Sequence, residues 1–273
     1  MKRHALIFDL GLALPALAFL LAFFLVPMVE LAIVGGSGAN GIAEYFTLAT
    51  NPRHFRVMVA TLVLSILVTL ATLAIATTVG LFLARNVFPG RAVLLSMLTL
   101  PLAFPGVVVG FLIIILAGRQ GLLNTMSQAV GGGRVVFAYS MVGLFLGYLY
   151  FSIPRVLLTV MAGVEKLDPQ VVEAARSLGA SPFQVLRDVT LPALKPALIA
   201  SGAVAFATAM GAFGTAFTLA TDIDVLPMLI YTEFTLQANF ATAAALSIVL
   251  GLVTWLVLVV ARSFAGTTVA AAG

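Results

Sequence analysis

The sequence predicts an all-α membrane protein with six transmembrane helices. Of its 273 residues, 62% are hydrophobic and only 9% are charged, whereas a soluble domain is nearer half apolar and a quarter charged. Six stretches reach the length of about 20 apolar residues that a bilayer-spanning helix needs. The alternating pattern of a membrane β-barrel is not seen, so the spans are expected to be helices.

The six predicted spans cover most of the chain. They are residues 10–34, 57–84, 92–117, 135–161, 197–221 and 241–262. The first apolar run is longer than the core of a signal peptide, so we expect a retained helix. Pro101 and Pro105 are expected to kink the third span. The predicted organisation is a first helix with its external loop (1–56), a five-helix core (57–262) and a short tail (263–273).

The basic residues predict the orientation, because Lys and Arg collect in cytoplasmic loops. With the N-terminus inside, ten fall on the cytoplasmic side and four outside. The inside set is Lys2, Arg3, Arg85, Arg91, Arg155, Lys166, Arg176, Arg187, Lys195 and Arg262, and the outside set is Arg53, Arg56, Arg119 and Arg134. Both termini are then cytoplasmic, and the longest cytoplasmic loop is 163–196.

Composition excludes several kinds of site. There is no cysteine, which excludes disulfides and thiolate metal ligands, and the two histidines are far apart in the sequence. We therefore expect no metal site. The net charge of +4 is explained by the cytoplasmic loops, so no nucleic-acid partner is expected.

The cytoplasmic loop carries the signals of two short helices. Asp168-Pro169 and Ser181-Pro182 each place a capping side chain before a proline at the first helical position. Gly179 lies between them and is typical of a helix end, because glycine tolerates the left-handed conformation. We expect Leu191-Pro192 to end the second helix.

The second of these helices has an apolar stripe. Phe183, Leu186 and Val189 recur at three-residue spacing. So short a helix is marginal alone and needs a surface that buries the stripe. That surface is either the ends of the spans, which makes the loop a simple connector, or another protein. The residues alone favour neither.

The loop matches a known pattern that begins with E-A-A and has a glycine after three further residues. After nine more residues come an aliphatic residue, one residue of any type, and L-P. The matching residues are Glu173-Ala174-Ala175, Gly179, Val189 and Leu191-Pro192. This segment resembles the EAA loop of bacterial ATP-binding-cassette (ABC) importer permeases of the type I, binding-protein-dependent group. The resemblance extends, more weakly, over most of the chain from about residue 57.

The resemblance implies that the loop is a coupling helix, which docks in a groove of a separate ATPase. The residues that would make this contact are Glu173, Ala174, Ala175, Gly179, Ser181, Phe183, Leu186 and Pro192. It also implies an ATPase dimer that binds ATP and Mg, a second permease, usually a different chain, and an external solute-binding protein, all at a bacterial inner membrane. This chain has no GxxxxGK[ST] phosphate loop, so it is expected to be a transport subunit, not an enzyme, without a cofactor of its own.

The fifth span, SGAVAFATAMGAFGTAFTLAT, is rich in small and hydroxyl-bearing residues. Polar groups within spans tend to line a path or a helix interface. The residues we assign to the translocation path are Thr208, Gly211, Phe213, Gly214, Thr215 and Thr218. Small-residue packing between helices is an equal and compatible interpretation.

The stretch GAFGTAFTLATDIDVLPMLIYTEF resembles the spermidine/putrescine, iron(III) and 2-aminoethylphosphonate branch of these permeases. Polyamine permeases usually carry an acidic residue in the fifth span, and this chain has none there. Asp222 and Asp224, at the outer end, are candidates for an external vestibule, although acidic residues at such ends are usually only solvated. The substrate stays open among a phosphonate, a polyamine, iron(III) and other small solutes.

Arg155, within the fourth span, has two interpretations. It either reaches the cytoplasmic surface, which we favour, or meets an anionic substrate. The competing class of function is a self-sufficient secondary transporter, which needs a buried ionisable relay or broken inverted repeats. Neither is found in the sequence, nor is a protease motif or a repeated pore motif.

Overall fold

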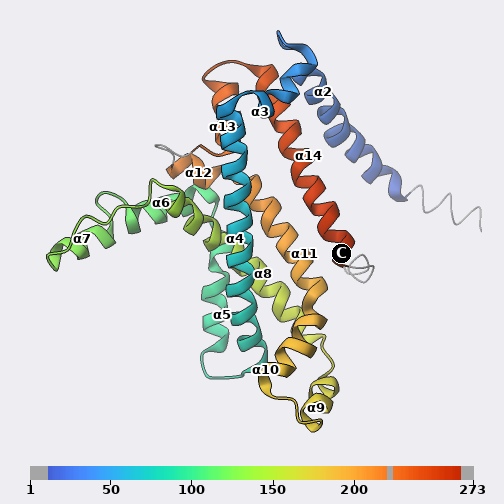
Figure 1. Cartoon of the computed structure of the whole chain (residues 1–273), viewed down its shortest axis with the longest axis vertical. Coiled ribbons are helices and arrows are strands. Elements are labelled where there is room, and N and C mark those ends of the chain that lie inside the picture. Colours follow the sequence, from blue (N-terminus) through green and yellow to red (C-terminus); the bar gives the residue numbers. More distant parts are fainter. Residues whose placement is uncertain (1–11, 220–223, 266–273) are drawn as a thin grey trace, which may run out of the picture. The chain divides into compact units, whose positions relative to one another are not determined.

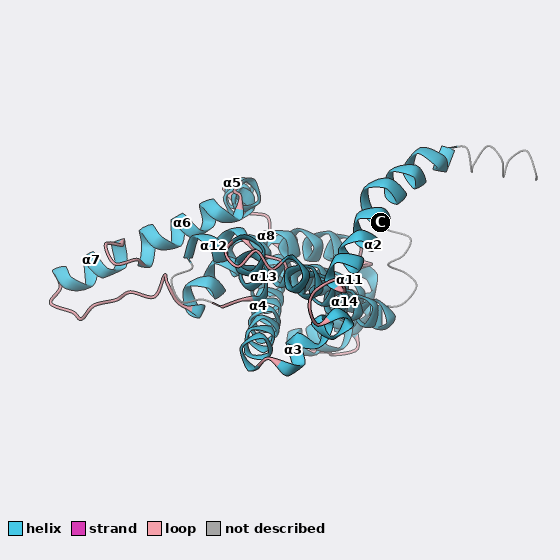
Figure 2. Cartoon of the chain, turned by 90° about the horizontal axis from the view of Figure 1, so that it is seen from above, coloured by secondary structure: helices cyan, strands magenta, loops and turns pink. Residues whose placement is uncertain are grey.

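The computed structural model describes residues 12–219 and 224–265 of the chain. The described residues form helices joined by turns and by a longer loop over 130–140, and Figure 2 shows no strand among them. Six helical segments are long and apolar enough to cross a membrane: Leu12–Gly35, Pro52–Arg85, Gly106–Ala129, Met141–Glu165, Pro182–Met210 and Phe240–Phe264. The predicted all-α class with six spans is therefore confirmed.

The chain forms two compact units. One contains the residues up to Arg56 together with Leu229–Gly251, and the other contains Val57–Met228 together with the residues from Leu252. Three helices pass from one unit to the other: α4 (Pro52–Arg85), α13 (Leu226–Thr235) and α14 (Phe240–Ala265).

The smaller unit holds the first span and the segment after it. Its elements are η1 (Leu21–Leu25), α2 (Val26–Gly35), η2 (Gly41–Phe46) and α3 (Thr47–Thr50), with the adjoining parts of α4, α13 and α14. The Tyr45 hydroxyl donates a hydrogen bond to the Ala32 carbonyl. The carboxyl group of Glu44 is buried and accepts hydrogen bonds from Thr242 Oγ1 at 3.0 Å and Asn40 Nδ2 at 2.8 Å. These bonds tie η2 to α2 and α14.

The larger unit holds the rest of the chain. Between α4 and α13 its elements are α5 (Arg91–Thr99), η3 (Leu100–Ala103), α6 (Gly106–Ala117), α7 (Leu122–Ala129), α8 (Met141–Glu165), α9 (Pro169–Ser177), α10 (Pro182–Gln184), η4 (Val185–Thr190), α11 (Leu191–Met210) and α12 (Gly214–Leu219). In both Figure 1 and Figure 2, α7 projects from the end of α6 away from α8, while α9 and α10 lie beyond the end of α4 in Figure 1.

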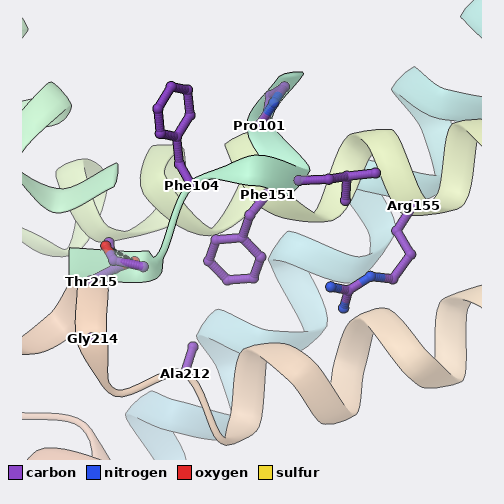
Figure 3. Close-up of a pocket in the computed structure, with 9 residues that line it drawn as sticks. Pro101, Phe104, Phe151, Arg155, Ala212, Gly214 and Thr215 are labelled. Carbon is purple, nitrogen blue, oxygen red and sulfur yellow. Dashed lines mark hydrogen bonds between the residues drawn. The ribbon is translucent and has the colours of Figure 1, made fainter. Parts of the chain in front are cut away.

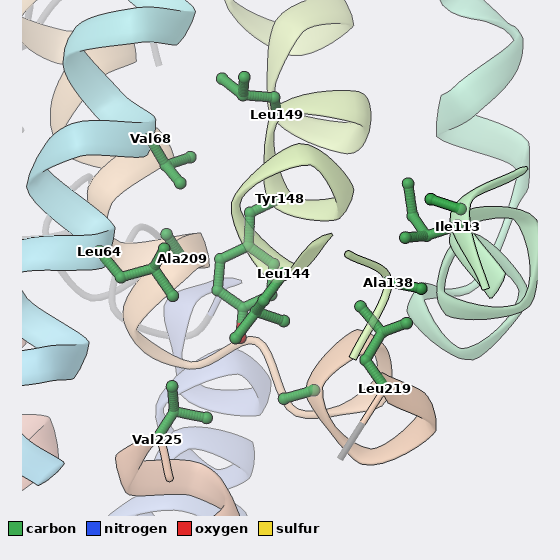
Figure 4. Packing of buried hydrophobic residues seen from close by; sticks show 12 residues of the cluster. Leu64, Val68, Ile113, Ala138, Leu144, Tyr148, Leu149, Ala209, Leu219 and Val225 are labelled. Carbon is green, nitrogen blue, oxygen red and sulfur yellow. The ribbon is translucent and has the colours of Figure 1, made fainter. Parts of the chain in front are cut away.

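The core of the larger unit surrounds Tyr148 on α8 (Figure 4). Leu64 and Val68 of α4 and Ala209 of α11 belong to the same buried cluster. The buried Tyr148 hydroxyl donates a 2.5 Å hydrogen bond to the carbonyl of Ala212, which lies between α11 and α12. The core therefore fixes the backbone at the point where the fifth span is interrupted.

Two predicted spans are not continuous helices. The third, expected over 92–117, is divided into α5 with η3 and α6, because Pro101 falls in η3 and Pro105 is extended, with φ −60° and ψ 150°. The fifth, expected over 197–221, ends as α11 at Met210 and resumes as α12 at Gly214. The expected kink of the third span is thus a full break, and the fifth contains a break that the sequence did not predict.

Candidate functional site

The segment between α8 and α11 carries the coupling residues predicted from sequence. Asp168 Oδ1 accepts a hydrogen bond from the Gln170 amide at 2.9 Å and caps α9. Ser181 and Gln184 form a reciprocal capping box at the start of α10, with bonds of 2.7 Å and 3.3 Å. Both predicted helix starts are present, so local hydrogen bonds define the shape of this loop.

Gly179 makes the turn between the two helices. Its φ is +86°, in the left-handed region that favours glycine. The Gly179 amide donates to the Arg176 carbonyl at 2.9 Å, and the Ala180 amide donates to the Ala175 carbonyl at 3.1 Å. This pair of bonds is a Schellman motif, which ends α9 without leaving these carbonyls unpaired.

The second short helix does not end at Leu191-Pro192, contrary to the prediction from sequence. It runs from α10 through η4, a π-helical turn, directly into α11. Pro192 lies in the first turn of α11, and the wider i to i+5 pattern of a π-helix accommodates the missing amide there. One continuous helical path therefore joins α10 to the fifth span.

Most of the predicted coupling side chains are exposed. Glu173, Ala174, Gly179, Ser181 and Pro192 are exposed, while Ala175 and Leu186 are half-buried. Phe183 leaves 68% of its surface exposed, and the neighbouring Leu178 leaves 89%. The apolar stripe that the sequence predicted is thus only partly covered by this chain.

The base of the loop is anchored to α4. Val185 and Thr190 of η4 are buried. Arg85, the last residue of α4, donates a hydrogen bond from Nη2 to Thr190 Oγ1 at 2.7 Å. Further into the unit, Leu83 of α4 packs with Val156, Leu157 and Val160 of α8.

A cavity of about 270 Å³ opens where the two interrupted spans meet α8. Its lining residues are Pro101, Leu102, Phe104, Gly106, Phe151, Arg155, Ala212, Gly214 and Thr215. In Figure 3, Phe151 and Arg155 extend from α8 toward the ribbon of α11. The cavity therefore has aromatic walls and one cationic group.

The residues assigned to the translocation path fall into three groups. Gly214 and Thr215 line the cavity, and Thr208 contacts Arg155. Thr218 packs against Gly110 of α6, and its Oγ1 donates to the Gly214 carbonyl of its own helix at 3.0 Å. Gly211 ends α11, and Phe213 packs on the Phe217 ring, with centroids 5.3 Å apart. Both interpretations of the fifth span, path lining and helix packing, thus have residues in support.

The Arg155 side chain is directed toward α11 in Figure 3. Its Nη1 donates a hydrogen bond to Thr208 Oγ1 at 3.2 Å, and its side chain lines the cavity. Arg155 is exposed as well as bonded to Thr208, and its preference for the cytoplasmic surface stays a prediction. Phe104 and Phe151, which also line the cavity, were not singled out from sequence, because aromatic residues in an apolar span carry no distinguishing signal.

The vestibule prediction is only partly within the described structure. Asp224 is exposed and lies two residues before the start of α13. Asp222 lies outside the described residues.

Comparisons with known proteins place the chain among transport proteins. The model of the family "Binding-protein-dependent transport system inner membrane component" matches residues 76–267. PhnU of Salmonella typhi, named as a permease protein of a 2-aminoethylphosphonate transport system, is 30% identical over 246 residues, which cover 88% of this chain and 85% of PhnU. CysW of Synechocystis sp., named as a sulfate transport system permease protein, is 31% identical over 244 residues, 85% of each chain.

Solved structures show the same fold. A chain from the crystal structure of a bacterial alginate ABC transporter, in complex with an alginate pentasaccharide-bound periplasmic protein, superposes with a TM-score of 0.79 and 21% identity over 95% of this chain and 93% of that chain. Together with the family match, this identifies the chain as a member of the binding-protein-dependent transport system inner membrane component family, with the fold of a type I ABC importer permease.

Proposed function

We propose that this chain is the subunit through which a small solute, delivered by an external binding protein, crosses the inner membrane by ATP-driven alternating access. Family membership supports a role in transport rather than in catalysis. In the proposed cycle an ATPase dimer binds ATP and Mg, closes, and moves the loop around α9. The permease then changes the side of the membrane to which its solute path is open. Both termini are proposed to be cytoplasmic, from the distribution of Lys and Arg.

The observation that carries this proposal is the rigid, exposed turn between α9 and α10. Capping bonds at Asp168 and Ser181 fix the starts of the two helices, and the continuous path through η4 joins α10 to α11. An exposed aromatic side chain at Phe183 and a carboxylate at Glu173 are available to a groove on another protein. The turn can therefore transmit force in a way that a flexible connector cannot.

The other proposed partners follow from the family. The alginate transporter that resembles this chain was solved with its periplasmic protein, and we propose an external binding protein here also. A second permease completes the complex, usually as a different chain in importers of the branch this sequence resembles. The relatives' names suggest 2-aminoethylphosphonate or sulfate as solute, while a polyamine and iron(III) remain candidates from the resemblance of the fifth span.

The decisive experiment is a pull-down of the tagged full chain from gently solubilised native membranes, with the bound proteins identified by mass spectrometry. We expect an ATPase and a second permease. Glu173→Arg and Phe183→Ala should each lose the ATPase, whereas Phe46→Ala, an equally exposed aromatic residue on η2, should retain it. A lone chain that transports solute in vesicles without ATP would instead establish a secondary transporter.

A further inference from the structure

We propose that the cavity around Arg155 is an oxyanion-binding site on the solute path, so that the transported solute carries a phosphonate-like or sulfate-like group. This inference rests on the proposed transport function and names the substrate class that the path accepts.

Arg155 lies deep within the membrane-spanning part of α8. Fourteen residues of the helix precede it (141–154) and ten follow it (156–165). At about 1.5 Å of rise per residue, it stands about 15 Å from the nearer helix end. A charged side chain at such a depth is costly unless it faces protein or a water-filled space, and such residues are typically functional.

Two spans are interrupted at this same cavity. At the first break, Phe104 and the first residue of α6, Gly106, contribute to the wall. At the second break, Ala212 and the first residue of α12, Gly214, contribute to it. Non-helical backbone is tolerated at membrane depth only where it is buried in protein or lines a cavity. Transporters use such broken helices to form their solute sites. The two breaks thus indicate a site for a solute. A cavity that was only a packing defect could form between unbroken helices.

The hydrogen bonds of Arg155 leave most of its donors available. Thr208 Oγ1 accepts one bond from Arg155 and donates its own proton to the Val204 carbonyl at 2.8 Å. A guanidinium has five N–H donors. In the part of the chain that the structure describes, no carboxylate lies within ion-pair distance of Arg155. The guanidinium is thus held in place by Thr208 while keeping donors for an anion.

The chemistry of the cavity selects an oxyanion over a cation. A guanidinium offers parallel donors that match two oxygens of a phosphonate or sulfate group, whereas its charge repels a polyamine or a ferric ion. Gly106 begins α6, a twelve-residue helix whose positive end adds to the favourable potential. The rings of Phe104 and Phe151 supply apolar walls, so the cavity also accommodates a short organic substituent.

The direct test is thermal unfolding of the full chain in lipid nanodiscs, with sodium sulfate, methylphosphonate, 2-aminoethylphosphonate or spermidine as probe and sodium chloride at matched ionic strength as reference. A bound probe raises the unfolding midpoint by mass action. We expect at least one oxyanion to raise it and spermidine not to. Arg155→Gln should weaken oxyanion affinity about 10- to 100-fold, the value of a charge-assisted hydrogen bond. Comparison of sulfate with the two phosphonates identifies the preferred group.

Matched variants separate a binding role from a structural one. Arg119→Gln makes the same charge change at an exposed arginine outside the cavity, 5.9 Å above the Tyr139 ring, and should bind as the wild type does. Arg155→Lys and Thr208→Val should bind with intermediate affinity, and they provide the test if Arg155→Gln does not fold. If Arg155 only joined α8 to α11, its variants would lower the midpoint but keep the full oxyanion shift, which would overturn the proposal.

The same variants keep this inference distinct from the proposed function. Arg155→Gln should still recover the ATPase in the pull-down, while uptake of the preferred oxyanion by proteoliposomes of the co-purified complex falls. Recovery of the ATPase without any oxyanion effect overturns the inference alone. Oxyanion binding by a chain that recovers no ATPase overturns the proposed function alone.

Discussion

Arg85 Nη2 donates a 2.7 Å hydrogen bond to Oγ1 of Thr190, a side chain with no exposed surface. The bond joins the end of α4 to η4, the π-helical turn through which the loop enters α11. Thr190→Val keeps the shape of the side chain and removes the acceptor of a charged donor. We expect a loss of about 1–3 kcal/mol in unfolding free energy, measured by denaturation in detergent. Thr78→Val, at an exposed hydroxyl bonded within α4, should change stability much less.

Gly179 should tolerate only residues that adopt the left-handed conformation. No atom would lie within 4 Å of an added Cβ, so the cost of substitution comes from its φ of +86° alone. Gly179→Val should destabilise the turn by about 1–2 kcal/mol, and Gly179→Asn by less. Hydrogen exchange of the Gly179 and Ala180 amides measures this local effect. Equal exchange rates in the two variants would contradict this prediction. The control is Gly133→Ala, because Gly133 is also in open space but has no positive φ.

Gly110 allows α6 to pack closely on α12. An added Cβ would lie 2.5 Å from Thr218 Cβ, so Gly110→Ala must push the two helices apart. We expect a loss of about 1–3 kcal/mol, as for other overpacked sites. In Gly251→Ala no atom lies within 4 Å of the new methyl group, so the midpoint of unfolding should stay equal or rise. A Gly110→Ala protein as stable as the wild type would show that this contact is loose.

The smaller unit depends on a buried carboxyl group. Thr242 Oγ1 donates to Glu44 Oε2, and both residues are at most 6% exposed. Thr242→Val leaves that oxygen without this donor in a buried place, which should cost about 1–3 kcal/mol. Proteolysis of the segment 36–50 should accelerate. Unchanged cleavage would mean that Asn40, the other donor to Glu44, is sufficient.

The loop was largely predictable because its signals are local. A capping side chain before a proline, at Asp168 and Ser181, and a glycine with positive φ act within a few residues. The continuation of the helix through Pro192 was not predictable, since a proline is equally compatible with the end of one helix and the first turn of the next. The π-helical turn that joins the two has no sequence signature of its own.

The cavity could not be derived from the sequence. Its wall combines residues about a hundred positions apart, such as Phe104 and Ala212, and only tertiary packing brings them together. The LPLAFPG segment indicated a kink, but whether prolines bend or break a helix depends on what fills the space beside them. Arg155 was visible as an unusual charge, but the direction of its side chain depends on Thr208, more than fifty residues away.

The exposed apolar turn has a consequence for how this protein is made. Leu178 and Phe183 display 89% and 68% of their surfaces on a backbone that capping bonds hold in place. A chain without a covering surface presents a persistent apolar site, which favours adhesion to other molecules and removal by proteases. We therefore expect the steady-state amount of this protein to follow the supply of its partner, so that unassembled copies do not accumulate.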